Sequence, residues 1–282
     1  MTQKKSESWL KPLWRNLTGQ KDESVVFEGD SEHNHITVSD RGDTRTLYLG
    51  PDANEAETSI NLANPSHDVF EYPGLMFLGL ALSPRNKKIL MLGLGGAYIP
   101  KLFQQYLPEH ELTVVEVDPL VAEVASVYFG FEAGGNVSLA IRDGLEYVAC
   151  APDGSFDQIW LDAFDGHYIP AHLANREFLE LVKLKLAPEG LAIQNLHQTS
   201  WLRYVEQLEN TVEVFSSQPL LFSGQRCGNT VCFSLNSEDK RLPDDVEAVI
   251  KAVKKFRLKI GPYDLVEEAK KIDNKFRPVI PF

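Results

Sequence analysis

The 282-residue sequence predicts an α/β fold in which a doubly wound, mostly parallel sheet follows a small N-terminal antiparallel β domain. Short, continuous apolar runs alternate with helical segments after residue 87, as expected of strands that are buried on both faces. Residues 24–62 instead contain strand-like runs separated by turn signals. A glycine-rich turn joins the first buried run to a helix, which is typical of a cofactor-binding sheet.

Residues 1–22 are predicted to form an arm that precedes the β domain. Five apolar residues recur in it at helical spacing among basic residues: Trp9, Leu10, Leu13, Trp14 and Leu17. A membrane-surface helix has this pattern, but Pro12 makes the segment a poor anchor on its own. We expect the arm to pack on the body of the protein or on a second subunit.

Residues 23–62 are predicted to form the small β domain. Its strand-like segments are residues 25–27, 35–38 and 46–49, with a turn at residues 40–43. Residues 64–66 (Asn-Pro-Ser) are expected to break the chain. A helix is expected over residues 69–82, ended by Ser83 and the following proline.

Residues 63–240 are predicted to form the cofactor-binding catalytic domain, with residues 241–282 as C-terminal helices that pack on it. The strands are expected at seven apolar runs, namely residues 89–92, 112–117, 137–141, 159–161, 191–193, 219–222 and 231–235. The closing helices are expected over residues 244–256 and 263–272.

The charge balance excludes some classes of function. The chain has 28 Lys and Arg against 40 Asp and Glu, a formal net charge of -12, which argues against general nucleic-acid binding and suits a small cationic substrate. The three cysteines and the histidines lack metal-site spacing, so we expect no metal. The longest apolar run is too short to cross a bilayer and no signal-peptide core is found, so we expect a cytoplasmic protein without an integral membrane segment.

The turn that follows the first buried run contains Gly93, Gly95 and Gly96. Such a turn lets the backbone approach a ligand and directs the N-terminus of the next helix toward it. Glu116 ends the second strand, 23 positions beyond Gly93 (116 minus 93), near the spacing expected of an acid that binds ribose hydroxyls. The nearby Asp118 precedes a proline and is predicted to be a helix N-cap.

Two further strands also end in acidic residues. Asp143 and Gly144 follow the third strand, and Asp162 follows the fourth. Ligands of open parallel sheets bind at the carboxyl ends of the strands, so these tips are expected to meet Gly93 and Glu116 in one crevice. Each acid alone could equally be a helix cap or a turn former.

The motifs resemble the spermidine synthase (polyamine aminopropyltransferase) family in order and spacing. The matching segments are residues 89–96, 114–119, 142–144 and 161–165, together with residues 31–38 upstream. The resemblance covers roughly residues 25–235 and implies a Rossmann-like, S-adenosylmethionine-dependent methyltransferase-type doubly wound sheet with an N-terminal β domain. It implies a transferase of polyamine biosynthesis that moves an aminopropyl group from decarboxylated S-adenosylmethionine to an amine.

The resemblance also assigns roles to residues. Glu116 is implied to bind the ribose and Asp143 the adenine amino group, while Asn34 stands where the family has glutamine. Asp162, with Asp165 beside it, is implied to act on the attacking amine, which must lose a proton before it can attack a sulfonium carbon. Tyr168 in the same loop is a candidate for substrate binding. Family members commonly form dimers or tetramers, and we expect a homodimer.

Two family motifs are altered in this sequence. The glycine loop carries Gly96 where the family has the aspartate that contacts the amine of the donor. The Tyr-His-Glu segment that helps to bind the acceptor is replaced by residues 70–76, in which Glu71 is the candidate replacement acid. These departures are shared with a divergent spermidine synthase-like subgroup, and they leave the donor and the acceptor open.

Three alternatives therefore stay open. A methyltransferase could use intact S-adenosylmethionine, because loss of the loop aspartate leaves room for the cofactor carboxylate beside backbone amides. A non-catalytic relative could bind a nucleoside without turnover. An NAD-dependent dehydrogenase is disfavoured because Ala97 and Tyr98 disrupt the spacing of the third glycine.

Overall fold

The fold is described from a computed structural model. It describes residues 23–50, 56–68, 70–164, 169–198, 200–224, 228–243, 245–256, 259–261 and 263–270. The predicted arm (residues 1–22), Asp165 and Tyr168 lie outside these ranges, so their expected roles stay predictions.

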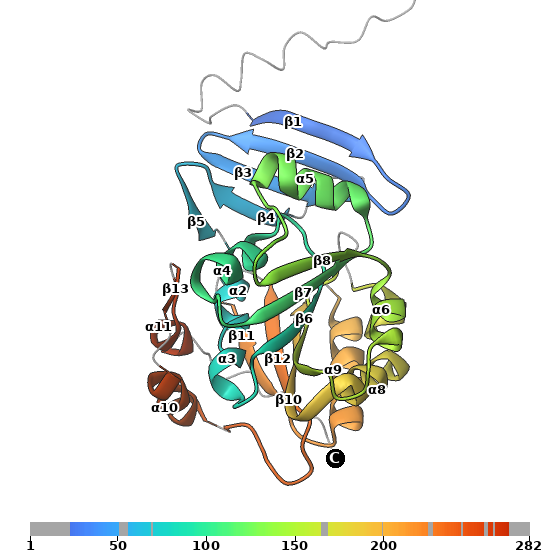
Figure 1. Cartoon of the computed structure of the whole chain (residues 1–282), viewed down its shortest axis with the longest axis vertical. Helices are drawn as coiled ribbons and strands as arrows, with labels where there is room; N and C mark the ends of the chain where they lie inside the picture. Colours follow the sequence, from blue (N-terminus) through green and yellow to red (C-terminus); the bar gives the residue numbers. More distant parts are fainter. Residues whose placement is uncertain are drawn as a thin grey trace, which may run out of the picture.

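The N-terminal sheet has five antiparallel strands in sequence order (Figure 1). They are β1 (Glu23–Asp30), β2 (His35–Arg41), β3 (Thr44–Leu49), β4 (Ala56–Asn61) and β5 (Asn64–Asp68). The small antiparallel sheet predicted from the sequence is thus confirmed.

The expected break at residues 64–66 was wrong, because β5 begins there. The side chain of Asn61 accepts hydrogen bonds from the amides of Ala63 and Asn64, at 2.9 and 3.0 Å, and turns the chain back on itself. Since β5 is an edge strand, its proline is tolerated.

The second sheet has seven strands in the order β11-β12-β10-β9-β6-β7-β8. All neighbours from β10 to β8 pair in parallel, whereas β12 is antiparallel to both β10 and β11. The strands are β6 (Lys88–Leu92), β7 (Glu111–Glu116), β8 (Val137–Ile141), β9 (Phe156–Leu161), β10 (Leu186–His197), β11 (Leu220–Ser223) and β12 (Asn229–Leu235). Every one of the seven predicted runs lies in or overlaps a strand.

Helices cover both faces of this sheet (Figure 1). On one face lie α3 (Gly79–Leu82), α4 (Tyr98–Tyr106), α10 (Val246–Phe256) and α11 (Leu265–Lys270). On the other lie α6 (Gly144–Cys150), α8 (Arg176–Lys185) and α9 (Trp201–Phe215). The remaining helices are α2 (Tyr72–Met76), α5 (Pro119–Phe129) and α7 (Ala171–Ala174).

Strand β6 shows why the runs are continuously apolar. Ile89 and Met91 belong to the core under α3 and α4, whereas Leu90 and Leu92 belong to the core under α6 and α8. Successive side chains of a strand point to opposite faces, so a strand between two helical layers needs apolar residues at every position.

Two predicted helices differ from those observed. The helix expected over residues 69–82 is divided into α2 and α3, because Leu78 and Leu80 bond to carbonyls three residues back and tighten the chain into a turn. The segment expected to be helical from residue 263 starts as β14 (Tyr263–Asp264), paired with β13 (Lys259–Ile260). The side chain of Asp264 accepts from the amide of Val266, so α11 begins only after it.

Polar contacts fasten the N-terminal sheet to the larger domain. Asp118 is the predicted N-cap of α5 and accepts from the amide of Leu120 at 2.9 Å, while its second oxygen accepts from the hydroxyl of Ser31 at 2.5 Å. Arg45 donates to the carbonyl of Tyr128, the penultimate residue of α5, at 2.9 Å. In Figure 1 this helix lies against the N-terminal sheet. Within the described ranges, no helix combines the length and the apolar character needed to cross a membrane.

Candidate active site

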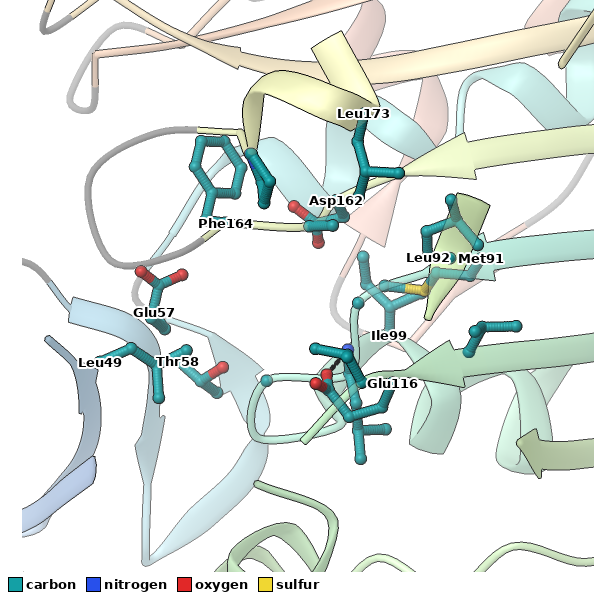
Figure 2. A pocket seen from close by; sticks show the side chains of 18 of the residues that line it. Leu49, Glu57, Thr58, Met91, Leu92, Ile99, Glu116, Asp162, Phe164 and Leu173 are labelled. Atoms are coloured by element: carbon teal, nitrogen blue, oxygen red, sulfur yellow. Dashed lines mark hydrogen bonds between the residues drawn. The ribbon is translucent and has the colours of Figure 1, made fainter. Parts of the chain in front are cut away.

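A cavity of about 250 Å³ lies at the carboxyl ends of the parallel strands. The cavity lies beside β6, where the strand order reverses. From β6 the chain continues to β7 and β8 on one side, and then crosses to β9 on the other side of β6. Such a switch point is where open α/β sheets bind ligands. The N-terminal sheet contributes a second wall through Glu57 and Thr58 (Figure 2), and Asn34, in the loop between β1 and β2, also lines the cavity.

The glycine loop after β6 lies directly against β9. Gly93 has φ +97°, and a Cβ added to it would lie 2.1 Å from the carbonyl oxygen of Asp162. Only glycine combines this conformation with this approach. Because Gly93 has no side chain, the end of β9 and the following Asp162 can lie directly beside the loop.

Most amides of this loop are already engaged. Four of the five from Gly93 to Ala97 donate inside the protein, to Val115 O at 2.8 Å, Glu116 Oε2 at 2.9 Å, Thr58 Oγ1 at 2.9 Å and Leu94 O at 2.9 Å. A carboxylate on a ligand therefore finds few free amides in this loop. The backbone amides that the sequence suggested as partners of a cofactor carboxylate are therefore mostly occupied.

Glu116 lies at the end of β7 and is buried, with 8% of its surface exposed. Its two carboxylate oxygens accept from the amides of Leu94 and Asp118, each at 2.9 Å. Burial raises the pKa of Glu116, and these backbone hydrogen bonds oppose the rise. Because a carboxylate oxygen accepts more than one hydrogen bond, both oxygens can still accept from a ligand.

Asp143 combines the two roles that the sequence left open. One oxygen caps α6 by accepting from the amide of Glu146 at 2.9 Å, and the other lies 3.3 Å from Nε2 of His172. Asp143 and its neighbour Gly144 both line the cavity. Its capping role thus leaves it at the ligand-facing edge of the sheet.

Asp162 follows β9 and lines the cavity. Burial raises the pKa of Asp162 to about 7, although hydrogen bonds from the side chains of Asn195 and Tyr72 act in the opposite direction. Nδ2 of Asn195 donates to its carboxylate at 2.8 Å. A carboxylate with a pKa near neutrality can both accept and release a proton at physiological pH.

Asn195 is itself fixed from behind. It lies in β10 with 2% of its surface exposed, and its side-chain oxygen accepts from Nδ2 of Asn229 at 3.0 Å. Asn229 begins β12, the antiparallel neighbour of β10. A chain of two amides therefore orients the Asp162 carboxylate.

The cavity is strongly acidic. Four carboxylates line it, from Glu57, Glu116, Asp143 and Asp162, and the described lining residues include no lysine or arginine. Figure 2 shows Glu57, Glu116 and Asp162 facing the same space from three different elements. Such a field favours a cationic ligand and opposes an anionic one.

Seven of the residues expected at the site line the cavity: Asn34, Gly93, Gly95, Glu116, Asp143, Gly144 and Asp162. Gly96 and Glu71 do not line it. Gly96 lies behind the loop against Thr58, and Glu71 is buried immediately before α2. The turn of α2 brings Tyr72 to the cavity wall, where Glu71 was expected.

Sequence reasoning missed four residues: Glu57, Thr58, Tyr72 and Asn195. Glu57 and Thr58 lie in a strand of the N-terminal sheet, about 35 residues before the glycine loop, and no local motif marks them. Asn195 did carry a signal, because a polar residue inside a buried apolar strand requires a hydrogen-bonding partner. Among the residues that the structure describes, no cluster of side chains suited to a metal ion is found.

The strand order and the position of the cavity define a Rossmann-like α/β fold of the S-adenosylmethionine-dependent methyltransferase type. A sequence profile of the spermine/spermidine synthase domain matches residues 72–222, more than half of the chain. The chain therefore belongs to the spermine/spermidine synthase family.

Individual relatives agree with this placement. The chain is 29% identical over 270 residues to a polyamine aminopropyltransferase of Vibrio vulnificus (strain CMCP6), covering 90% of each. Its fold is similar to the spermidine synthase of Thermotoga maritima, with a TM-score of 0.69 and 20% identity over 88% of this chain and 84% of that one. It is also similar to human methyltransferase-like protein 13 in complex with SAH, with a TM-score of 0.59 and 23% identity over 75% of this chain and 97% of that one.

Proposed function

We propose that this protein transfers the aminopropyl group of decarboxylated S-adenosylmethionine to a small amine of the polyamine class. The observation that carries the proposal is the set of four cavity carboxylates without a described lysine or arginine beside them. The decarboxylated donor has two positive charges, on the sulfonium and on the terminal ammonium, and the amine acceptor is also cationic. Family membership supports the same reaction class.

The residues have distinct roles in this reaction. Glu116 accepts from the ribose hydroxyls, and Asp143 accepts from the adenine amino group. The glycine loop supplies a surface without side chains against which the nucleoside packs. These roles place the sulfonium near the ends of β6 and β9, beside Asp162.

Asp162 acts on the acceptor. It orients the ammonium of the acceptor and takes one proton from it, so that the nitrogen lone pair becomes available. The nitrogen then forms a bond to the methylene carbon on sulfur, the carbon–sulfur bond breaks, and its electron pair stays on sulfur. The products are the aminopropylated amine, neutral methylthioadenosine and a proton on Asp162.

Methyl transfer from intact S-adenosylmethionine is less well supported. That cofactor carries a carboxylate, which the four cavity acids would repel. Most amides of the glycine loop already donate within the protein, so few remain to bind this carboxylate. The homodimer and the cytoplasmic location stay predictions from the sequence.

The experiment is a comparison of donors with the purified protein. We expect decarboxylated S-adenosylmethionine to bind more tightly than the intact form in calorimetric titrations. With diamines and polyamines as acceptors, mass spectrometry should detect methylthioadenosine and the aminopropylated amine. Formation of S-adenosylhomocysteine would instead support a methyltransferase, and tight binding without either product a non-catalytic nucleoside-binding protein.

Asn195→Leu tests the support behind Asp162. Loss of the 2.8 Å hydrogen bond removes an interaction that lowers the Asp162 pKa, so the pKa should rise further above 7. A hydrogen bond to a charged group contributes about 1.5 kcal/mol or more, which corresponds to about one pH unit. We expect the pH midpoint of the acidic limb of the kcat/KM profile to rise by about one unit, which lowers activity about fivefold at pH 7 and leaves it close to the wild-type value at pH 9.

The matched control is Gln198→Leu. This amide lies just beyond β10 and donates to Thr230 at 2.9 Å. Its replacement should leave the midpoint of the profile in place. An equal loss at every pH in Asn195→Leu would contradict a role through the Asp162 pKa.

A further inference from the structure

Glu57 lies at a β-bulge of the N-terminal sheet. Leu47 of β3 pairs with Thr58, but the next residue, Tyr48, pairs with Ala56, so Glu57 has no residue opposite it on β3. In a regular strand, neighbouring side chains such as those of Glu57 and Thr58 point to opposite faces. Here both line the cavity (Figure 2), as expected where a bulge redirects a side chain.

Thr58 connects this bulge to the glycine loop. Its hydroxyl accepts from the amide of Gly96 at 2.9 Å. A Cβ added to Gly96 would lie 2.7 Å from Cγ2 of Thr58 and 2.9 Å from its Cβ. Position 96 therefore cannot carry an acidic side chain in this chain unless Thr58 moves. The neighbour of Thr58 in β4, Glu57, does carry a carboxylate.

We infer that Glu57 supplies the carboxylate that binds the terminal ammonium of the donor and selects the decarboxylated form. The inference rests on the proposed function, in which the donor is a sulfonium with an aminopropyl group. Glu57 forms a charge-assisted hydrogen bond with this ammonium. A donor that retains its own carboxylate near the same carbon is repelled by Glu57.

The positions of the other acids assign Glu57 to the donor. Asp162 carries the hydrogen bonds of Asn195 and Tyr72 and serves the acceptor. Glu116 and Asp143 lie at the ends of strands β7 and β8, where the nucleoside is placed. Glu57 is next to the glycine loop through Thr58, on the wall made by the N-terminal sheet.

The test is calorimetric titration of the wild-type chain and Glu57→Gln with three ligands. These are decarboxylated S-adenosylmethionine, intact S-adenosylmethionine and methylthioadenosine, which lacks the aminopropyl group. Glu57→Gln should weaken binding of the decarboxylated donor about 10-fold, the usual scale for one charge-assisted hydrogen bond, and leave methylthioadenosine within about twofold. Its preference for the decarboxylated over the intact form should fall. Retained binding of methylthioadenosine also shows that the variant is folded.

Glu111→Gln is the matched control. Glu111 is exposed where β7 begins, at the end of the sheet opposite the cavity. The affinities of the Glu111→Gln variant for all three ligands should therefore equal those of the wild type. Unchanged binding of the decarboxylated donor to Glu57→Gln would overturn the inference. So would an equal loss of methylthioadenosine binding, or a rise in KM for the amine acceptor alone.

The two proposals fail separately. A wild-type chain that prefers the intact cofactor would reject the proposed function. A wild-type chain that prefers the decarboxylated donor, with the same preference in Glu57→Gln, would reject only the role of Glu57.

Discussion

Asp162→Asn is expected to lower kcat by about 10²- to 10⁴-fold, the usual contribution of a positioned general base. Asparagine keeps the shape and the oxygen that accepts from Asn195, but it cannot take a proton from the acceptor amine. Binding of methylthioadenosine should change little, because its contacts are assigned to Glu116, Asp143 and the glycine loop. Steady-state kinetics with a diamine acceptor, together with a titration of methylthioadenosine, separate the two effects.

The wild-type pH dependence follows from the same group. Since burial raises the pKa of Asp162 to about 7, kcat/KM should increase with pH up to about 7 as the carboxylate ionises. The control is Asp239→Asn, an exposed aspartate that does not line the cavity, which should behave like the wild type. An Asp162→Asn enzyme with near wild-type turnover would contradict the assignment of the base.

Stability provides an independent readout of the Asp162 charge. The folded chain holds a proton on Asp162 up to about pH 7, whereas the unfolded chain releases it near the usual 3.8. The stabilisation from this group is complete below 3.8 and is lost as the pH rises through 7. Asparagine cannot ionise, so the melting temperature of the variant relative to the wild type should increase from about pH 4 to pH 7 and then level.

Much of the fold could be predicted because its signals are local. The apolar runs of β6 and β10 are continuous over several residues, and the glycine turn after β6 marks where α4 begins. Two of the three departures from the predicted elements depend on side chains that bond to the backbone. Asn61 turns the chain into β5, and Asp264 delays the start of α11.

The site was predictable where it follows from sheet topology. Gly93, Glu116, Asp143 and Asp162 end successive parallel strands, and strand ends meet whatever the details of packing. The wall made by the N-terminal sheet could not be predicted in this way. Glu57 reaches the cavity only through a one-residue shift in strand pairing, which leaves no periodic trace in the sequence.

Gly93→Ala is expected to destabilise the fold by about 3 kcal/mol or more and to abolish activity. The positive φ of 97° costs an alanine about 1 kcal/mol, and forcing an atom into packed space commonly costs 1–3 kcal/mol. The new Cβ would overlap the carbonyl oxygen of Asp162 at 2.1 Å, so β6 and β9 would have to separate where Asp162 leaves the sheet. Urea unfolding followed by circular dichroism measures the stability, and the aminopropyl transfer assay measures the activity.

Two other glycines separate the two causes of this loss. Gly130 also has a positive φ, 65°, but a Cβ there meets nothing within 4 Å, so Gly130→Ala isolates the backbone cost of about 1 kcal/mol. Gly134 has open space and no such backbone constraint, so Gly134→Ala should stay within about 0.5 kcal/mol of the wild type. If Gly93→Ala lost no more stability than Gly130→Ala, the loop would not lie against Asp162 as described. The base would then not be held in place by the glycine loop.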